Sequence, residues 1–288
     1  MLCPPAPLWA HLLPSGTEGD ERPTVRLELL TQRPHGDAHT TPILFVHGAW
    51  CAAWCWADHF LPYFAAHGYA AHALSLRGHG GSEGRERLRW TSTAEYVADV
   101  EQAARQLGGA PVMVGHSMGG FVLQHYLGRH NVPAAVLLAS ASHRGLSWPL
   151  ALGVARRHPR CLLSVLITLD TYPLVATPEL AQELLLSAQL PRSLAAGCQE
   201  RLQDELLRAF LEMLVGPRPK PGRVRTPVLV LAAGDDRVVS PAEMHGLAHA
   251  HRADIAVVPD SAHAVMLDPA CQDAADTILA WLERLGMS

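Results

Sequence analysis

Apolar runs that alternate with helical patterns constrain this chain more than any other feature. Four runs hold Val, Leu, Ile, Phe and Ala at consecutive positions: 42–48, 111–115, 134–140 and 227–234. A continuous apolar run of this length is typical of a strand buried on both faces of a sheet. Segments with apolar residues at helical spacing lie between them, and 92–108, with a Ser92–Glu95 capping box, is the clearest. Further strands are predicted at 24–30, 69–78 and 254–259. The alternation predicts an α/β fold with a mostly parallel sheet and helices on both faces.

Residues 141–225 interrupt this alternation. They contain helical patterns such as PELAQELLLSAQL but no convincing strand. At their end, PRPKPGRVRTP has the composition of a linker. We therefore divide the chain into a core of residues 24–140 and 226–288 and an inserted helical block, 141–225, which we expect to form a cap. Residues 1–23 contain several prolines and are expected to form a loose N-terminal arm.

Composition excludes several classes of protein. Of 288 residues, 49% are hydrophobic and 17% are charged, which fits a globular protein with a sizeable core. The net charge is −4 and Lys220 is the only lysine, so nucleic acid is not an expected partner. No apolar run reaches the ~18 residues of a membrane span. The N-terminus lacks the basic start of a signal peptide, and we expect a cytoplasmic protein.

Cysteine and histidine give no sign of a metal site or a disulfide framework. The six cysteines are dispersed, and free thiols are favoured, although a bridge between Cys51 and Cys55 stays open. Seventeen histidines are spread along the chain, HExxH is absent, and the closest cluster is His245, His249 and His251 on a helix expected to be exposed. We expect no metal and no cofactor.

Residues 115–119, GHSMG, place a serine between a buried strand and a helix. A tight turn of this kind forces unusual backbone angles on Ser117 and holds its hydroxyl out over the sheet edge. Bulk two positions to either side would collide with the strand and helix, so Gly115 and Gly119 suit their places. Because ligands of parallel sheets gather at the carboxyl ends of strands, this context predicts a nucleophile.

A serine nucleophile needs a base that takes its proton and a carboxylate that orients the base. DDRVVSP follows the strand at 227–234, and DSAHAVMLDP follows the strand at 254–259. We assign His263 as general base and then general acid, with Asp236 as its orienting carboxylate. Asp235 is the alternative acid.

An oxyanion needs backbone donors near the serine. FVHGAW ends a buried strand, and we expect its loop to turn back toward Ser117. The amides of Ala49 and Met118 are the predicted oxyanion hole, in which each donor contributes about 3 kcal/mol to lowering the barrier. His47, Trp50, Trp54 and His116 are predicted to lie at the substrate pocket.

These motifs resemble those of the serine α/β-hydrolases across residues 24–286. The resemblance rests on His47-Gly48, on RGHGGSEG at 77–84, on GHSMG, and on the acid and His263 near the end of the chain. It implies the α/β-hydrolase fold, with a sheet of the eight-stranded type and a helical cap, and it makes block 77–84 a structural turn. The first loop is similar to that of plant methylesterases and hydroxynitrile lyases, and RGHGGSEG is more similar to bacterial esterases and monoacylglycerol-lipase-type enzymes.

Two differences from these relatives restrict the class of reaction that the chain can catalyse. Ser117 replaces the Asp nucleophile of epoxide hydrolases and dehalogenases, and Ala264 stands where the lyases carry a lysine after the catalytic histidine. We therefore expect hydrolysis of small to medium, partly apolar carboxylic esters through an acyl-enzyme. A C–C, lactone or thioester hydrolase with the same triad, or a non-catalytic ligand-binding protein of this fold, is the alternative.

Overall fold

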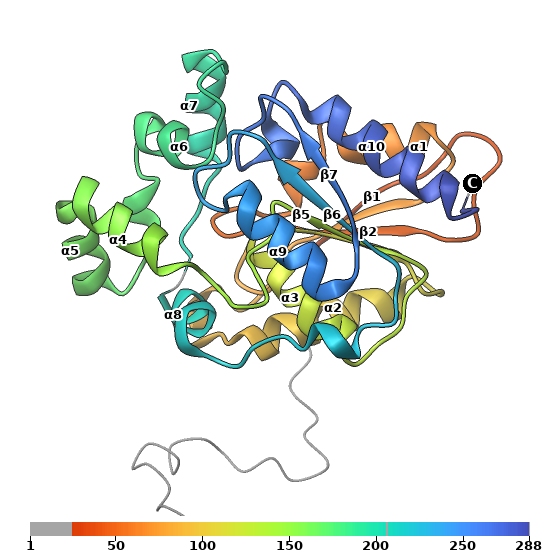
Figure 1. The fold of residues 1–288 in the computed structure, drawn as a ribbon, viewed down its shortest axis with the longest axis horizontal. Helices are drawn as coiled ribbons and strands as arrows, with labels where there is room; N and C mark the ends of the chain where they lie inside the picture. Colours follow the sequence, from red (N-terminus) through yellow and green to blue (C-terminus); the bar gives the residue numbers. More distant parts are fainter. Residues whose placement is uncertain (1–24, 206, 288) are drawn as a thin grey trace, which may run out of the picture.

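The computed structural model describes residues 25–205 and 207–287, and its centre is a single twisted sheet (Figure 1). The order of the strands across the sheet is β1-β3-β2-β4-β5-β6-β7. Only the β1–β3 pair is antiparallel, and all other neighbours are parallel. The strands are β1 (Leu29–Gln32), β2 (Ile43–Val46), β3 (Ala71–Leu74), β4 (Val112–His116), β5 (Ala135–Leu138), β6 (Val228–Ala233) and β7 (Asp254–Val258). The predicted arm, 1–23, lies outside the described residues.

Two details of the sheet differ from the prediction. The described residues form seven strands, whereas the family resemblance implied the eight-stranded type. The first strand was expected at 24–30 but begins at Leu29. The backbone before it pairs with a loop and not with a strand, because Glu83 N donates to Arg26 O and Ser75 N donates to Glu28 O.

Helices cover both faces of the sheet, as the alternation predicted (Figure 1). On one face α1 (Phe60–Ala66) packs beside α10 (Cys271–Arg284), and on the other α2 (Thr93–Gln106) packs beside α3 (Met118–Leu127). α9 (Pro241–His251) lies on the α3 face, where His251 Nε2 is 3.4 Å from Gln124 Oε1. The Ser92–Glu95 capping box at the start of α2 is confirmed.

The described chain between β5 and β6 is largely helical. It forms α4 (Trp148–Arg157), α5 (Pro159–Thr168), α6 (Pro178–Leu184), α7 (Arg192–Glu200) and α8 (Leu207–Val215). Short 3₁₀ helices occur at Ala53–Trp56, Arg85–Trp90, Tyr172–Leu174, Pro221–Arg223 and Val265–Leu267. Figure 1 places α4–α8 together on the left, at the opposite side of the molecule from the C-terminus.

The core lies along the central strands, where every residue of β2, β4, β5 and β6 is buried. The five cysteines of the described residues are free thiols, Cys51 and Cys55 included, and Cys3 lies outside them. Within the same residues, no helix combines the length and the apolar character needed to cross a membrane.

Candidate active site

The turn after β4 holds Ser117 in a conformation that few residues with a side chain adopt. Its φ is 51° and its ψ is −117°, and such a conformation costs on the order of 1–3 kcal/mol. The surrounding backbone keeps it there, because Ser117 N donates to Leu138 O and Ser117 O accepts from Phe121 N and Ala141 N, each at 3.1 Å. The serine is therefore fixed at the corner between β4 and α3.

Close packing explains the two glycines that flank this turn. A Cβ at Gly119 would lie 2.4 Å from His47 O and 2.5 Å from Val46 O, which are immobile backbone atoms. A Cβ at Gly115 would lie 2.8 Å from Gly119 O. The absence of side chains here lets the start of α3 pack directly against the end of β2.

Three side chains predicted from the sequence come together above the sheet edge. His263 Nε2 lies 2.8 Å from Ser117 Oγ, and His263 Nδ1 lies 2.8 Å from Asp236 Oδ2. A carboxylate accepts hydrogen bonds and does not donate them, so Nδ1 carries the imidazole proton and Nε2 accepts from the serine hydroxyl. The three groups form one hydrogen-bonded chain that ends at the serine oxygen.

The carboxylate end of this chain is fixed by backbone donors. Asp236 Oδ1 accepts from Val238 N at 2.7 Å and from Val239 N at 2.9 Å, which leaves Oδ2 for the imidazole. The side chains of Asp236 and His263 are 0% and 2% exposed. Asp235, the alternative acid, is exposed, and its amide donates to Ser261 O. Of the two acids, only Asp236 contacts the histidine.

His116 and His47 lie beneath the site and not at its mouth. The His116 ring nitrogen Nε2 lies 2.9 Å from the His263 carbonyl oxygen and donates to it. This bond fixes the backbone of His263, whose own imidazole contacts Ser117. Burial first, and then the nearby His263, hold the pKa of His116 well below its usual range. His47 Nε2 accepts from Leu76 N, and burial together with His79 lowers the pKa of His47 to about 3. Both rings are therefore neutral near pH 7.

A mostly apolar cavity of about 160 Å³ opens beside the serine. Ala49, Trp50, Met118 and His263 form its wall on the sheet side, with Ser117 at its floor. Residues of the inserted block form most of the rest, among them the helical residues Leu150, Ala151, Val154, Leu162, Val165, Phe210 and Met213. Trp50 was predicted at the pocket and lines this cavity.

The other predicted pocket residues, His47, Trp54 and His116, do not line the cavity. The two histidines are bonded within the core, as described above, and the Arg201 guanidinium lies 4.1 Å from the centre of the Trp54 ring. Adjacency in the sequence to Ser117 or to Ala49 is a poor guide to the direction of a side chain, because neighbouring residues point to different sides of the backbone.

Sequence reasoning missed a set of contacts that joins Trp50 to the inserted block. Trp50 has a φ of 61°, its carbonyl accepts from Gln203 N at 2.9 Å, and its indole N–H donates to Thr171 Oγ1 at 3.0 Å. The Thr171 hydroxyl in turn donates to Glu205 O at 2.8 Å. Trp50, which directly follows Ala49, is thus held by hydrogen bonds at both its backbone and its side chain.

The Glu205 carboxylate continues this connection into the core. It accepts from Tyr96 OH at 3.1 Å and lies 3.0 Å from His79 Nε2, and His79 and Glu205 are fully buried. Burial by itself lowers the pKa of His79, but the carboxylate outweighs it, and the pKa lies above its ordinary value. The RGHGGSEG block therefore also anchors the inserted segment, a role that no local sequence pattern signals.

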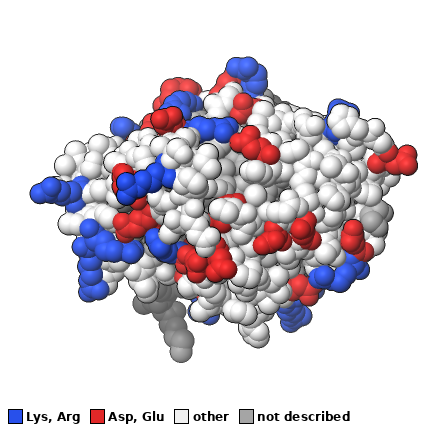
Figure 2. All heavy atoms as spheres, turned by 90° about the horizontal axis from the view of Figure 1, so that it is seen from above, with Lys and Arg blue, Asp and Glu red and all other residues white. Residues whose placement is uncertain are grey.

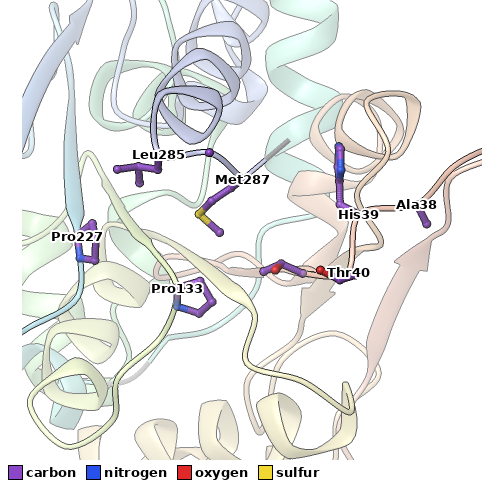
Figure 3. Close-up of a pocket in the computed structure, with 9 residues that line it drawn as sticks. Ala38, His39, Thr40, Pro133, Pro227, Leu285 and Met287 are labelled. Atoms are coloured by element: carbon purple, nitrogen blue, oxygen red, sulfur yellow. The ribbon is translucent and has the colours of Figure 1, made fainter.

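A larger hollow of about 540 Å³ lies at the other edge of the sheet (Figure 3). His39, Pro133 and Pro227, which line it, precede β2, β5 and β6, so it lies by the amino ends of the strands. It contains no serine or cysteine next to a base, and we do not assign the chemistry to it. In the described residues, no group of three or more His, Cys, Asp or Glu side chains is arranged to hold a metal ion.

Comparison with known proteins defines the class. The profile of the alpha/beta hydrolase family matches residues 43–275. The chain therefore belongs to the alpha/beta hydrolase family, in agreement with the seven-stranded fold and the turn at Ser117. A search of curated proteins found no match.

Solved structures with the same fold share little sequence with this chain. A carboxylesterase structure from the thaumarchaeon Nitrososphaera gargenis has a TM-score of 0.70 and 18% identity, covering 91% of this chain and 96% of that one. A thermophilic esterase from Thermogutta terrifontis has a TM-score of 0.67 and 18% identity, covering 91% and 94%. The monoacylglycerol lipase of Paleococcus ferrophilus has a TM-score of 0.62 and 19% identity, covering 91% and 100%. At these identities the likeness shows the fold alone.

Proposed function

We propose that this protein is a serine hydrolase that cleaves carboxylic esters through an acyl-enzyme. The observation that carries the proposal is the chain of two 2.8 Å contacts from Asp236 through His263 to Ser117, ending in an apolar cavity. His263 takes the proton of the Ser117 hydroxyl as the oxygen attacks the ester carbonyl, and then gives it to the leaving alcohol. A water molecule, activated by the same imidazole, releases the acid and restores the serine.

The amides of Ala49 and Met118 are the proposed oxyanion hole. Both residues line the cavity beside Ser117, and within the described residues neither amide has a hydrogen-bond acceptor. Met118 is the first residue of α3, so its N–H lies at the positive end of the helix dipole. The negative charge that develops on the carbonyl oxygen would accept from both donors.

The inserted block 141–225 is the proposed cap, because its residues form most of the cavity wall. A cavity of about 160 Å³ is close in size to apolar cavities of roughly 150 Å³ that bind benzene. The proposed substrates are therefore esters with a short acyl chain or a small apolar group. Apart from Ser117, Ser147, Thr171 and His263, all lining residues are apolar, which favours an uncharged group.

The fold neighbours support a hydrolase but do not separate the ester from the alternatives, since they include a carboxylesterase, an esterase and an N-acyl homoserine lactone degrading enzyme. The same triad could act on a lactone, a thioester or a C–C bond, and a binding protein could retain it without turnover. These alternatives differ in the products they form, so a panel of substrates separates them.

The test is a series of p-nitrophenyl esters, from acetate through butyrate and hexanoate to decanoate, with a lactone and a thioester beside them. We expect kcat/KM to be highest for the short chains because the cavity is small. Ser117→Ala should lower kcat by more than about 10³-fold. Equal activity of the two proteins on every substrate would refute the proposed function, and ligand binding without turnover in both would support a binding protein.

A further inference from the structure

The outer surface of the α4–α5 hairpin is unusually apolar. Of the twelve large apolar side chains that are exposed among the described residues, nine lie in the inserted block. Six of these are on the hairpin and the residue that follows it, with exposed fractions between 43% and 73%: Trp148, Leu152, Leu163, Leu166, Ile167 and Leu169. An apolar surface gathered on one element in this way marks an interaction site more often than scattered exposed residues do.

Both helices are apolar on two opposite faces. On α4, Leu150 and Val154 line the cavity while Trp148 and Leu152 face outward. On α5, Leu162 and Val165 line the cavity while residues 163, 166 and 167 face outward. A helix that is apolar all round is typical of one that is covered on all sides. The cavity accounts for the inner face only, and no part of the chain that the structure describes covers the outer face.

The charges on the hairpin have one sign. Arg156, Arg157 and Arg160 lie on it, and residues 148–169 contain no Asp or Glu, although the whole chain carries a net charge of −4. Glu183 of α6 faces Arg157 at 3.7 Å and His158 at 3.0 Å. Arg156 and Arg160 form no ion pair within the described part of the chain. Figure 2 shows several groups of Lys and Arg atoms, with Asp and Glu atoms beside them, at its left end, where Figure 1 places this hairpin.

We propose that the outer face of α4 and α5 docks on a lipid bilayer that contains anionic lipids. An apolar helix face with arginines beside it and a tryptophan at its end has the composition of an element that lies in the membrane interface. The apolar side chains would enter the acyl boundary, and the arginines would meet the lipid phosphates. A second copy of the chain fits this face less well, because it would bring two sets of arginines together with no carboxylates on the hairpin to pair with them.

This docking has a consequence for the substrate. The helices that would rest on the bilayer also form part of the cavity wall, so only this hairpin and the cavity would separate the bilayer from Ser117. This consequence rests on the proposed function, whereas the docking itself rests only on the surface. The substrate class would then be uncharged apolar esters that partition into lipid.

The test uses the full chain with Ser117→Ala, so that binding is measured without hydrolysis. The protein is sedimented with vesicles of phosphatidylcholine alone or with about one third phosphatidylglycerol. We expect binding to the anionic vesicles that weakens with salt. Leu166→Glu with Ile167→Glu should lower the partition coefficient about tenfold or more. Arg156→Gln with Arg160→Gln should lower it about 25-fold on anionic vesicles, since each arginine contributes about fivefold.

The matched control is Val257→Glu, which places the same charge at an apolar side chain that is 44% exposed on β7, outside the inserted block. It should leave vesicle binding unchanged. In the background with Ser117 intact, the Leu166/Ile167 variant should hydrolyse a soluble p-nitrophenyl ester at the normal rate, which shows that it folds. Absence of binding at low salt would overturn the proposal. So would a dimer that the glutamates abolish in a protein that does not bind vesicles.

Discussion

The sheet and the inserted block use apolar side chains in different ways. Every residue of β2, β4, β5 and β6 is buried, whereas α4 has no buried residue and α5 has only Val165. The proposed triad stands on loops that follow β4, β6 and β7. The cavity wall opposite the triad comes from the block. The comparison indicates that the sheet fixes the reacting groups and the block supplies a surface that can be changed with less effect on folding.

This division makes different predictions for the two regions. Changes in the sheet region should abolish turnover or destabilise the fold, because buried strands and backbone donors hold its groups on several sides. Changes in the block should alter rate or selectivity and leave most of the stability in place.

The largest effect is expected at the acid of the sheet region. Asp236→Asn keeps the shape but lets the amide donate to His263 Nδ1, which favours the wrong imidazole tautomer. We expect kcat to fall by about 10⁴-fold. Asp235→Asn is the matched control, because its exposed side chain does not contact the histidine, and its kcat should stay within about threefold. Similar losses in both variants, measured with a p-nitrophenyl ester, would leave the choice of Asp236 without support.

The next largest effect is expected on the free energy of unfolding, at Gly119. Gly119→Ala places a Cβ 2.4 Å from His47 O and 2.5 Å from Val46 O, so β2 and α3 must separate. We expect the free energy of unfolding to fall by about 3 kcal/mol in urea titrations. Gly246→Ala, in α9, has no heavy atom within 4 Å of the new Cβ and should raise stability by about 1 kcal/mol. A neutral Gly119→Ala would show that the turn is less tightly packed than these distances indicate.

The strands and the three loops of the proposed triad were predictable because their signals are local. Uninterrupted apolar runs marked β2, β4, β5 and β6, and the glycines around Ser117 marked the turn. His263 and the acid pair Asp235–Asp236 followed from the rule that the carboxyl ends of parallel strands meet at one edge. The order of the triad and the choice of Asp236 rested on the resemblance to α/β-hydrolases. The antiparallel edge strand β1 was placed too early because alternation continues through residues that pair with a loop.

The contacts of the block could not be predicted in this way. Trp50 and Thr171 are 121 positions apart in the sequence, and His79 and Glu205 are 126 apart, with no pattern that joins either pair. The apolar composition of residues 148–169 also gives no indication of which side chains face the cavity and which face outward. Only the placement of these helices over the cavity decides this.

Acid should destabilise the sheet region through one buried histidine, His251, by about 2 kcal/mol. Burial lowers the pKa of His251, on α9, to about 4, and the nearby His143 adds to this effect. The unfolded state binds a proton below about pH 6.5 and the folded state does not, so stability falls as the pH drops from 6.5 toward 4. At pH 5 His251 alone should lower the free energy of unfolding by about 2 kcal/mol relative to its value at pH 8.

His251→Gln removes this titrating group. The free energy of unfolding of the variant, relative to that of the wild type, should therefore rise by about 2 kcal/mol when the pH is lowered from 8 to 5. Urea titrations at the two pH values measure the difference. His249→Gln, an exposed residue of the same helix, is the control and should show no such gain. A constant difference between the His251 variant and the wild type would mean that His251 titrates normally in the folded state.

The smallest effect is expected where the two regions meet, at the bond between Trp50 and Thr171. Thr171→Val leaves the buried indole N–H without its acceptor, which costs on the order of 1–3 kcal/mol. Trp50 should then shift, and with it the adjacent Ala49 amide that is the proposed oxyanion donor. We expect kcat to fall about tenfold while KM changes by less than about threefold, because the amide acts on the transition state more than on the ground state.

Thr168→Val is the matched control for this variant, because Thr168 is exposed and its hydroxyl bonds only to the backbone of residues nearby in the sequence. It should leave both constants unchanged. A rise in KM at constant kcat in Thr171→Val would mean that Trp50 serves only as a wall of the cavity, and that the block and the sheet act independently. A fall in kcat alone would show that the block, although it carries none of the reacting side chains, sets the position of the loop on which the oxyanion depends.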